Sequence, residues 1–421
     1  MRNTTRRTFV AGAGAIGAGV YVNRLGIKRA RASEPVRIGG QGAMSGAHAD
    51  YGLQMRMGAE LAIAELNEAG GILGREIVLN WLDEELRPDV ATRNCRQLVE
   101  EWGADMLTGI DSSGSAMAVG QIMPELDRVL IVTHGATHRF TEELVARDGI
   151  KQIFRASVPI YQDSILAAYV FAEREDIVRW ANIGADYEYG HASWLMFKDT
   201  LSKLRPDVEF VAEAWAPFQT LDFSGHVSSV MAQRPDGVFA TPWAGEAISM
   251  LRAALSMGGF AQIQAWWQAM GGSVDVLEGV SGQLEQFDDK LWATARYLFT
   301  YAPDETKDLN DAFLAAFQEK FDRLPNYSAE CTYSAIKSYA EAAEAAGSTD
   351  TADVIAALEG MEIATPAGMR TYRPEDHQAV YAVPGGRIVR SDDWPIPVVG
   401  ADLALFDPQD YYRWPPFEPI D

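Results

Sequence analysis

Two short turns place hydroxyl side chains beside glycine residues, and they are the part of this sequence best suited to binding a small molecule. The first is Gly109-Ile-Asp-Ser-Ser-Gly114 and the second is His134-Gly-Ala-Thr137. Each follows a predicted strand and opens a predicted helix, so free backbone N–H groups and the hydroxyls of Ser112, Ser113 and Thr137 can converge on an anion. A carboxylate is the natural guest. The alternative is that these hydroxyls only cap the helices, as Ser and Thr often do.

The sequence shows little sign of an enzyme active site. No G-x-S-x-G, H-E-x-x-H, C-x-x-C or phosphate-loop motif occurs in a suitable position. His134 and His138 are four residues apart, and Glu142 follows after four more. They straddle a predicted strand-to-helix turn instead of sharing one helix, so their spacing does not predict a metal site. We expect no catalytic residue, no metal and no cofactor, and we expect the two histidines at the surface or behind the binding residues.

The elements that must position the two turns alternate in type along the chain. Short apolar runs predict strands, and amphipathic segments between them predict helices. A first series has strands near residues 36–40, 76–82, 104–109 and 129–133, with helices near 53–69, 88–102 and 113–126. After a crossover at 153–159, a second series has strands near 177–183, 208–215, 237–241 and 261–267. This pattern predicts an α/β protein with two parallel sheets, and it places both turns at the carboxyl edge of the first.

The last third of the chain predicts three helices, near residues 307–321, 328–346 and 352–359. The proline-rich segment 394–421 has little periodicity, so we expect it to wrap a lobe as a loop.

The first 32 residues differ from the rest. Thr5-Arg6-Arg7-Thr8-Phe9 precedes a short apolar run rich in Gly and Ala, and Ala30-Arg31-Ala32 supplies small residues for cleavage. This order is typical of a twin-arginine export signal that is cleaved near Ala32. A membrane anchor would need about 20 strongly apolar residues. We therefore expect a soluble protein of the periplasm.

Charge and cysteine content narrow the function further. The net charge is −23, which disfavours nucleic acid and anionic membrane as partners. Only two cysteines occur, Cys95 and Cys331. Cys95 shares a helical stripe with Ala91, Leu98 and Trp102, so a buried thiol is expected, although a bridge to Cys331 stays possible.

Motifs outside the two turns make the pattern specific. Gly42-Ala-Met-Ser-Gly46, Tyr51-Gly52, the run 67–74, Asp83 and Phe154-Arg155 surround the turns, and the runs 365–368 and 373–378 follow near the end. In this order the sequence resembles the branched-chain amino acid (Leu/Ile/Val) binding proteins of ABC importers over nearly all of the mature chain. The resemblance implies a type I periplasmic-binding fold, in which two doubly wound parallel α/β lobes are joined by three crossovers around a ligand cleft. It also implies an N-terminal lobe of residues 36–155 and 286–376, and a C-terminal lobe of residues 156–285 and 377–421.

The resemblance implies which first-lobe residues bind the ligand. By position, Ser113 and Thr137 match the hydroxyls that hold the ligand carboxylate, with backbone help from Gly135. Ser112 and Ala136 belong to the same two turns and are further candidate binding residues. Tyr51 matches an aromatic residue that lines the cleft.

The second lobe departs from the family pattern. The acid that takes the ligand ammonium in branched-chain members has no counterpart in Ala265-Trp-Trp-Gln-Ala-Met-Gly-Gly272. Because a buried ammonium without a carboxylate is costly, the cleft either uses another acid or binds a ligand without that charge. The candidate acids are Glu246, Glu188 and Asp186.

Aromatic residues gather where this acid is missing. Tyr187 and Tyr189 follow one strand, and Trp243 stands where the family has a tyrosine. Trp267 is expected to join them, although either it or Trp266 can be core, because neighbouring strand residues face opposite sides. Such a wall would stack on a ring or enclose a cation.

These inferences predict a monomeric periplasmic solute-binding protein that closes by hinge motion on a small carboxylate and delivers it to ABC permease subunits in the inner membrane. The ligand can be a branched or aromatic amino acid, an aromatic carboxylate, or an amide such as urea. A ligand-sensing protein of the same fold is one alternative. An exported enzyme is the other, and it would need a catalytic constellation that the sequence does not display.

Overall fold

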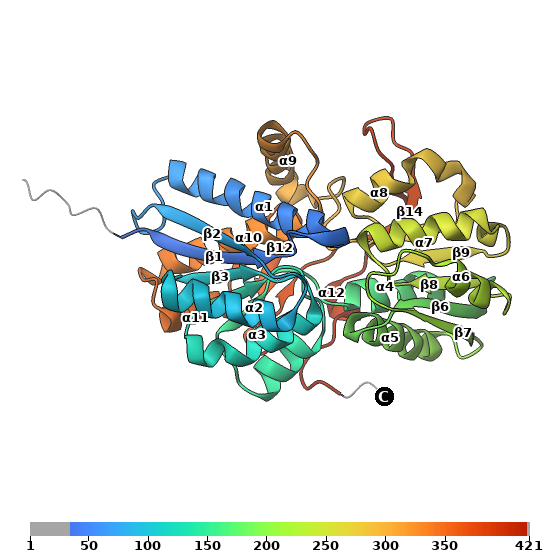
Figure 1. Ribbon diagram of the computed structural model, residues 1–421, viewed down its shortest axis with the longest axis horizontal. Coiled ribbons are helices and arrows are strands. Elements are labelled where there is room, and N and C mark those ends of the chain that lie inside the picture. Colours follow the sequence, from blue (N-terminus) through green and yellow to red (C-terminus); the bar gives the residue numbers. More distant parts are fainter. Residues whose placement is uncertain (1–33, 419–421) are drawn as a thin grey trace, which may run out of the picture. The chain divides into compact units, whose positions relative to one another are not determined.

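The computed structural model describes residues 34–418, so the predicted export signal lies outside the described residues. Two large sheets and one small sheet form the frame (Figure 1).

The first sheet is entirely parallel and has the strand order β2-β1-β3-β4-β5. Its strands are β1 (Val36–Gly42), β2 (Ile77–Asp83), β3 (Met106–Gly109), β4 (Val129–Val132) and β5 (Ile153–Arg155). The central strands β3 and β4 are buried along their whole length, as expected for a parallel sheet covered on both faces. The predicted alternation of strand and helix is therefore confirmed in this half.

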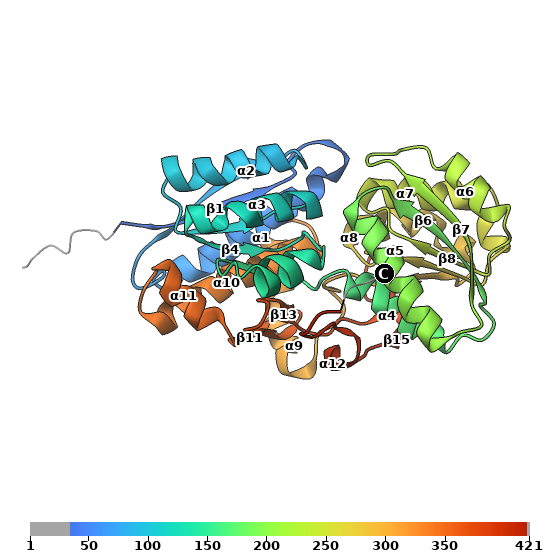
Figure 2. The same ribbon diagram turned by 90° about the horizontal axis from the view of Figure 1, so that it is seen from below.

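Helices cover both faces of the first sheet. Figures 1 and 2 show α2 (Pro88–Arg96) and α3 (Ser113–Leu126) on one face, and α1 (Ala49–Glu68) and α10 (Tyr327–Ala346) on the other. A π-helical turn at Gln97–Glu101 extends α2, and a second at Phe140–Arg147, here η3, precedes β5. Single 3-10 turns lie at Gly46–His48, Gly259–Ala261, Ser281–Phe287 and Asp304–Thr306.

The second sheet is mixed, with the order β15-β14-β10-β9-β8-β6-β7. Its parallel part contains β6 (Arg179–Ala185), β7 (Glu209–Ala216), β8 (Gly237–Ala240), β9 (Ala265–Gln268) and β10 (Leu291–Ala293). One face carries α4 (Tyr161–Ala172) and α5 (Glu188–Leu204), and the other carries α6 (Ser224–Met231), α7 (Ala244–Ser256) and α8 (Val274–Val280).

The later helices return to the first sheet. They are α9 (Lys307–Phe321), α10 and α11 (Thr351–Leu358). A Cβ atom at Gly58 of α1 would lie 2.1 Å from the Ala329 carbonyl oxygen, so only glycine allows α10 to lie this close to α1. A small antiparallel sheet follows, made of β11 (Glu362–Thr365), β12 (Gly368–Tyr372) and β13 (Ala379–Val380).

The chain passes between the two large sheets three times, after β5, after β10 and before β14 (Gly385–Val389). Hydrogen bonds link these passages: Arg155 Nε donates to Gln378 Oε1 at 2.6 Å, and Gln162 Nε2 donates to Thr294 Oγ1 at 2.8 Å. The predicted lobe boundary at residue 286 falls ahead of β10, which still pairs with β9 in the second sheet.

The expectation that residues 394–421 form only a loop was wrong. β15 (Val398–Ala404) pairs antiparallel with β14 at the sheet edge, and α12 (Pro408–Tyr411) follows. An edge strand is held by backbone hydrogen bonds to its one neighbour, so its side chains need not alternate in hydrophobicity. Periodicity alone therefore missed it.

Both cysteines are buried and unpaired, which settles the question that the sequence left open. Cys95 lies in the apolar layer between the first sheet and helices α2 and α3, as its helical spacing predicts. No helix in residues 34–418 is long and apolar enough to cross a membrane.

Candidate functional site

The two hydroxyl-bearing turns lie side by side, because β3 and β4 are parallel neighbours and end at the same sheet edge. Ser113 Oγ accepts a hydrogen bond from the Thr137 N–H at 3.2 Å, which ties one turn to the other. Ser112 instead caps α3, since its hydroxyl accepts the Ser115 N–H at 3.0 Å. The Gly135 N–H donates to the Ile110 carbonyl at 3.0 Å.

A cavity of about 10 Å³, here the inner cavity, lies where these turns face the second sheet. Its first-sheet side is formed by Asp111, Ser113, His134 and Ala136. Its other side is formed by Tyr187, Tyr189, Trp243, Met270 and Arg296. Tyr187, Trp243 and Met270 follow β6, β8 and β9, whose carboxyl ends share one edge. The volume suffices for about one water molecule, so the side chains nearly fill the space between the two sheet edges.

Five predicted residues thus line the inner cavity: Ser113, Ala136, Tyr187, Tyr189 and Trp243. Tyr51 lies directly behind it, where its ring stacks on His134 at 5.2 Å and its hydroxyl donates to Asp275 Oδ1 at 3.0 Å.

Other predicted residues lie outside the cavity wall. Trp267 is fully buried in the core, where its ring meets Phe171 edge to face and its Nε1–H donates to the Asp163 carbonyl. Trp266 points to the opposite face of β9 and stacks on Phe260. Glu246 is buried and accepts the Gln219 N–H. Ser112, Gly135 and Thr137 belong to the turns but are not among the lining residues.

A buried chain of polar side chains behind the cavity was not predicted from the sequence. His134 Nδ1 lies 2.6 Å from Asp111 Oδ1, and His134 Nε2 lies 2.5 Å from the Tyr327 hydroxyl. Arg296 Nη1 donates to the same hydroxyl at 3.3 Å, and its Nη2 lies 3.2 Å from Asp163 Oδ2. Of these residues, only His134 was singled out from the sequence. His134 is buried and not at the surface, and it lines the inner cavity beside Ser113.

The protonation state of His134 decides which atoms donate in its hydrogen bonds with Asp111 and Tyr327. Burial lowers the pKa of His134, although its hydrogen bond to Asp111 opposes this shift, so the ring is neutral near pH 7. A neutral ring has one donor and one acceptor. Nδ1–H therefore donates to the Asp111 carboxylate, and Nε2 accepts from Tyr327.

Trp243 follows a strand of the second sheet, and its ring packs against residues of the first-sheet side. Its ring centroid lies 5.0 Å from those of Tyr51 and His134, edge to face, and 4.1 Å from that of His48. Its Nε1–H donates to the Tyr187 hydroxyl at 2.9 Å, which fixes the ring orientation. The aromatic wall predicted from the sequence thus consists of Trp243 and two tyrosines, without Trp267.

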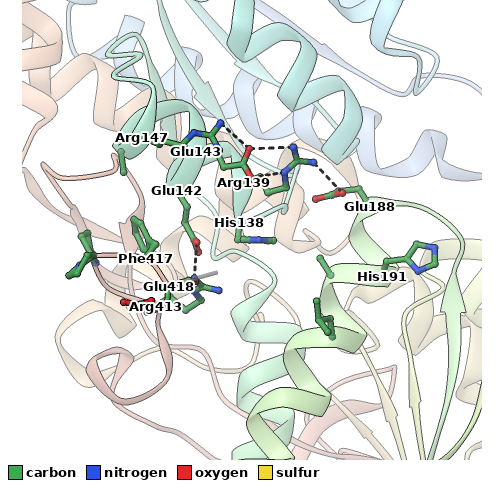
Figure 3. Close-up of a pocket in the computed structure, with 15 residues that line it drawn as sticks. His138, Arg139, Glu142, Glu143, Arg147, Glu188, His191, Arg413, Phe417 and Glu418 are labelled. Carbon is green, nitrogen blue, oxygen red and sulfur yellow. Dashed lines mark hydrogen bonds and ion pairs between the residues drawn. The ribbon is translucent and has the colours of Figure 1, made fainter. Parts of the chain in front are cut away.

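A larger pocket of about 810 Å³ lies outside this cavity, between η3, α5 and residues 413–418 (Figure 3). Its charges are largely paired: Arg139 lies between Glu143 and Glu188, and Glu142 pairs with Arg413 at 3.2 Å. Thr137 Oγ1 donates to Glu188 Oε1 at 3.0 Å, so this contact joins the turn after β4 to α5. The candidate acid Glu188 lines this pocket, whereas the predicted hydroxyl and aromatic residues do not. The inner cavity, which gathers five of the predicted binding residues, is therefore our candidate site.

Glu246 provides a pH prediction. Burial raises its pKa to about 7, and the Gln219 N–H only partly counteracts this. Between about pH 4.5 and 7 the folded protein then holds a proton that the unfolded chain has lost, so stability falls as pH rises through this window. Glu246→Gln should raise the free energy of unfolding by roughly 1–3 kcal/mol at about pH 8, and by nothing at about pH 4. Urea unfolding at both pH values measures this.

The matched control is Glu101→Gln, because Glu101 is exposed at the end of its helix. It should change stability at neither pH. An equal gain from Glu246→Gln at both pH values would contradict the assigned pKa.

One parallel and one mixed α/β sheet, joined by three passages and with a small polar cavity at their facing edges, define a class of protein that can enclose a small molecule between two lobes. The chain belongs to the periplasmic binding protein family, whose sequence profile matches residues 35–393.

Individual relatives agree with this assignment. A Leu/Ile/Val-binding protein homologue of Brucella melitensis is 28% identical over 349 residues, which cover 80% of this chain and 87% of the relative. An ABC transporter substrate-binding protein from Sphaerobacter thermophilus is 25% identical with a TM-score of 0.75, covering 89% of this chain and 98% of the other. A solute-binding protein of an ABC transporter from Rhodopseudomonas palustris BisB5, solved with 3,4-dihydroxybenzoic acid, has a TM-score of 0.77 at 21% identity, covering 89% and 97%. The fold is therefore that of the type I periplasmic binding proteins.

Proposed function

We propose that this solute-binding protein captures a small carboxylate in the periplasm and delivers it to ABC permease subunits in the inner membrane. One observation carries the proposal: Ser113 and Ala136 line the same cavity as Tyr187, Tyr189 and Trp243. A polar end and an aromatic wall suit a ligand that has a carboxylate at one end and an apolar body at the other.

Hinge closure is the proposed mechanism. Three contacts join residues of the two sheets' edges: Tyr51 with Asp275, Trp243 with His134, and Thr137 with Glu188. Opening the cleft would break all three, and a ligand that contacts both sides would favour the closed form by its differential affinity. The closed monomer would then dock on the permease. No bond is made or broken in this cycle.

The predicted export signal fits this location, with cleavage near Ala32 by the twin-arginine route. The ligand class comes from the relatives named above, one of which is called a Leu/Ile/Val-binding protein homologue and another of which was solved with an aromatic acid. Amino acids and aromatic carboxylates are therefore the first ligands to test. An amide or urea ligand, or a sensing role for the same fold, is the alternative.

A thermal-shift screen of amino acids, aromatic acids, short carboxylates and amides tests the proposal, because a ligand that binds only the folded state raises the melting temperature. At least one carboxylate should stabilise the protein. Ser113→Ala should weaken its binding about tenfold, which corresponds to the loss of one hydrogen bond to a charged group.

Ser112→Ala is the matched control. Its hydroxyl caps α3, so this change should lower stability by about 1 kcal/mol and leave the affinity unchanged. Stabilisation by amides alone, with no response to any carboxylate, would contradict the proposed ligand class.

A further inference from the structure

Arg296 supplies the positive charge in the wall of the inner cavity, and nothing in the sequence pointed to it. It follows β10, in the second passage between the sheets, and its side chain is 1% exposed. Burying a guanidinium is expensive unless its N–H groups are all bonded and its charge is matched. The partners of Arg296 therefore indicate whether it serves the fold alone.

Those partners leave the guanidinium incompletely satisfied. Nη1 reaches the His134 carbonyl and the Tyr327 hydroxyl, both at 3.3 Å, and Nη2 reaches Asp163 at 3.2 Å. These distances exceed the 2.7–2.9 Å typical of charge-assisted hydrogen bonds. Nε has no partner at all, and neither does Asp163 Oδ1.

Arg155 shows how a buried arginine with a purely structural role is bound in the same protein. Its Nε donates to Gln378 Oε1 at 2.6 Å, its Nη1 to the Thr137 carbonyl at 2.6 Å, and its Nη2 to Thr141 Oγ1 at 3.2 Å. All three nitrogens are bonded, and Arg155 does not line the inner cavity. Arg296 differs in both respects. The buried Arg370 also leaves Nε and Nη1 without a partner, but it does not line the inner cavity, so the place of Arg296 in the cavity wall is what sets it apart.

Asp111, the one acid among the residues that line the inner cavity, is not free to pair with a ligand ammonium. Asp111 lines the wall, but one oxygen is bonded to His134 and the other accepts the Ala43 N–H. Asp163 does not line the wall, and its Oδ2 already accepts from Tyr189 as well as Arg296. Glu188 is bonded to Thr137 and Arg139.

Resting on the proposed function, we propose that Arg296 determines specificity by pairing with the carboxylate of an aromatic acid that carries no ammonium group, with Tyr327 as a positioning residue. The guanidinium of Arg296 packs over the Tyr327 ring, with Cζ 5.2 Å from the ring centroid. Arg296 and Ser113 both line the inner cavity, so a carboxylate bound between them lies within reach of both. Because the cavity holds only about one water molecule here, the two sheet edges must lie further apart around a bound benzoate. The aromatic body would then meet Tyr187 and Trp243.

Calorimetric titration of the mature protein with benzoate, benzamide and leucine tests this inference. Benzoate and benzamide share a ring and differ in charge, while leucine adds the ammonium. The unchanged protein should bind benzoate at least about 100-fold more tightly than either of the others, because truncating or omitting one partner of a buried charge pair costs several kcal/mol.

Three variants separate recognition from structure. Arg296→Met should weaken benzoate at least about 100-fold and change benzamide by less than about threefold, and Arg296→Lys should lie between it and the unchanged protein. Asp163→Asn removes the competing charge beside Arg296, so benzoate should bind as tightly or more tightly. The ratio of acid to amide affinity is the readout, and a merely structural role would not move it.

The outcomes are distinguishable. Equal loss of benzoate and benzamide in a folded Arg296→Met or Arg296→Lys protein would show that Arg296 only holds the passages together. Tight binding of leucine, or failure to bind benzoate while another carboxylate stabilises the protein, would overturn this inference and leave the proposed function intact. If no carboxylate binds, the proposed function itself fails.

Discussion

Replacing Arg370 with methionine is expected to lower the free energy of unfolding by about 3–5 kcal/mol, the largest stability effect that we predict for a single change. Arg370 of β12 and Glu330 of α10 form an ion pair in which both side chains are completely buried. Ser334 Oγ donates to the same carboxylate at 2.7 Å, and the guanidinium lies 4.2 Å from the Tyr381 ring centroid. Methionine would leave the Glu330 charge buried without its partner.

Urea unfolding with linear extrapolation measures this loss. The control is Arg390→Met, because Arg390 pairs with Glu285 at the surface, where the two side chains are 57% and 67% exposed. That change should have no measurable effect, since exposed pairs contribute little.

A double variant identifies the cause. If the loss comes from the isolated carboxylate, Arg370→Met combined with Glu330→Met should recover much of it, because removing both charges also removes their desolvation cost. A double variant as unstable as the single one would place the loss in packing against Tyr381 instead.

The sequence predicts the frame and one side of the site well, and the reason is local. Ser113 and Thr137 each follow a predicted strand, and parallel neighbours end at one sheet edge, so their proximity follows from strand order alone. Tyr187 and Trp243 follow strands of the second sheet in the same way.

The buried polar residues beside the two turns could not be predicted from the positions of strand ends. Arg296, Asp163 and Tyr327 come from a passage and from the beginnings of α4 and α10, far apart in the chain. No strand-end rule relates such segments, and a lone arginine in a sequence carries no sign that it will be buried. A residue such as Trp267 presents the opposite case, since strand alternation allows either face, and only packing against Phe171 decides it.

Replacing Trp243 with leucine is expected to have the largest effect on ligand binding among the aromatic residues. Trp243 belongs to the second sheet's edge, yet its ring contacts Tyr51, His48 and His134 of the other side. These contacts exist only when the cleft is closed, so their loss penalises the closed form relative to the open form. An anchoring tryptophan of this kind is worth roughly 2–4 kcal/mol, so Kd for an aromatic carboxylate should rise about 30-fold or more.

The matched control is Trp266→Leu. Trp266 is also fully buried, but it stacks on Phe260 within the core of one sheet and reaches no residue across the cleft. Its loss should lower the melting temperature through the cavity that it leaves, with Kd unchanged in the protein that stays folded. Titration calorimetry and thermal unfolding of both variants separate the two effects. Tighter binding by Trp243→Leu would contradict this prediction. It would mean that the indole occupies space in the inner cavity that the ligand needs, and that the ligand does not pack on the ring.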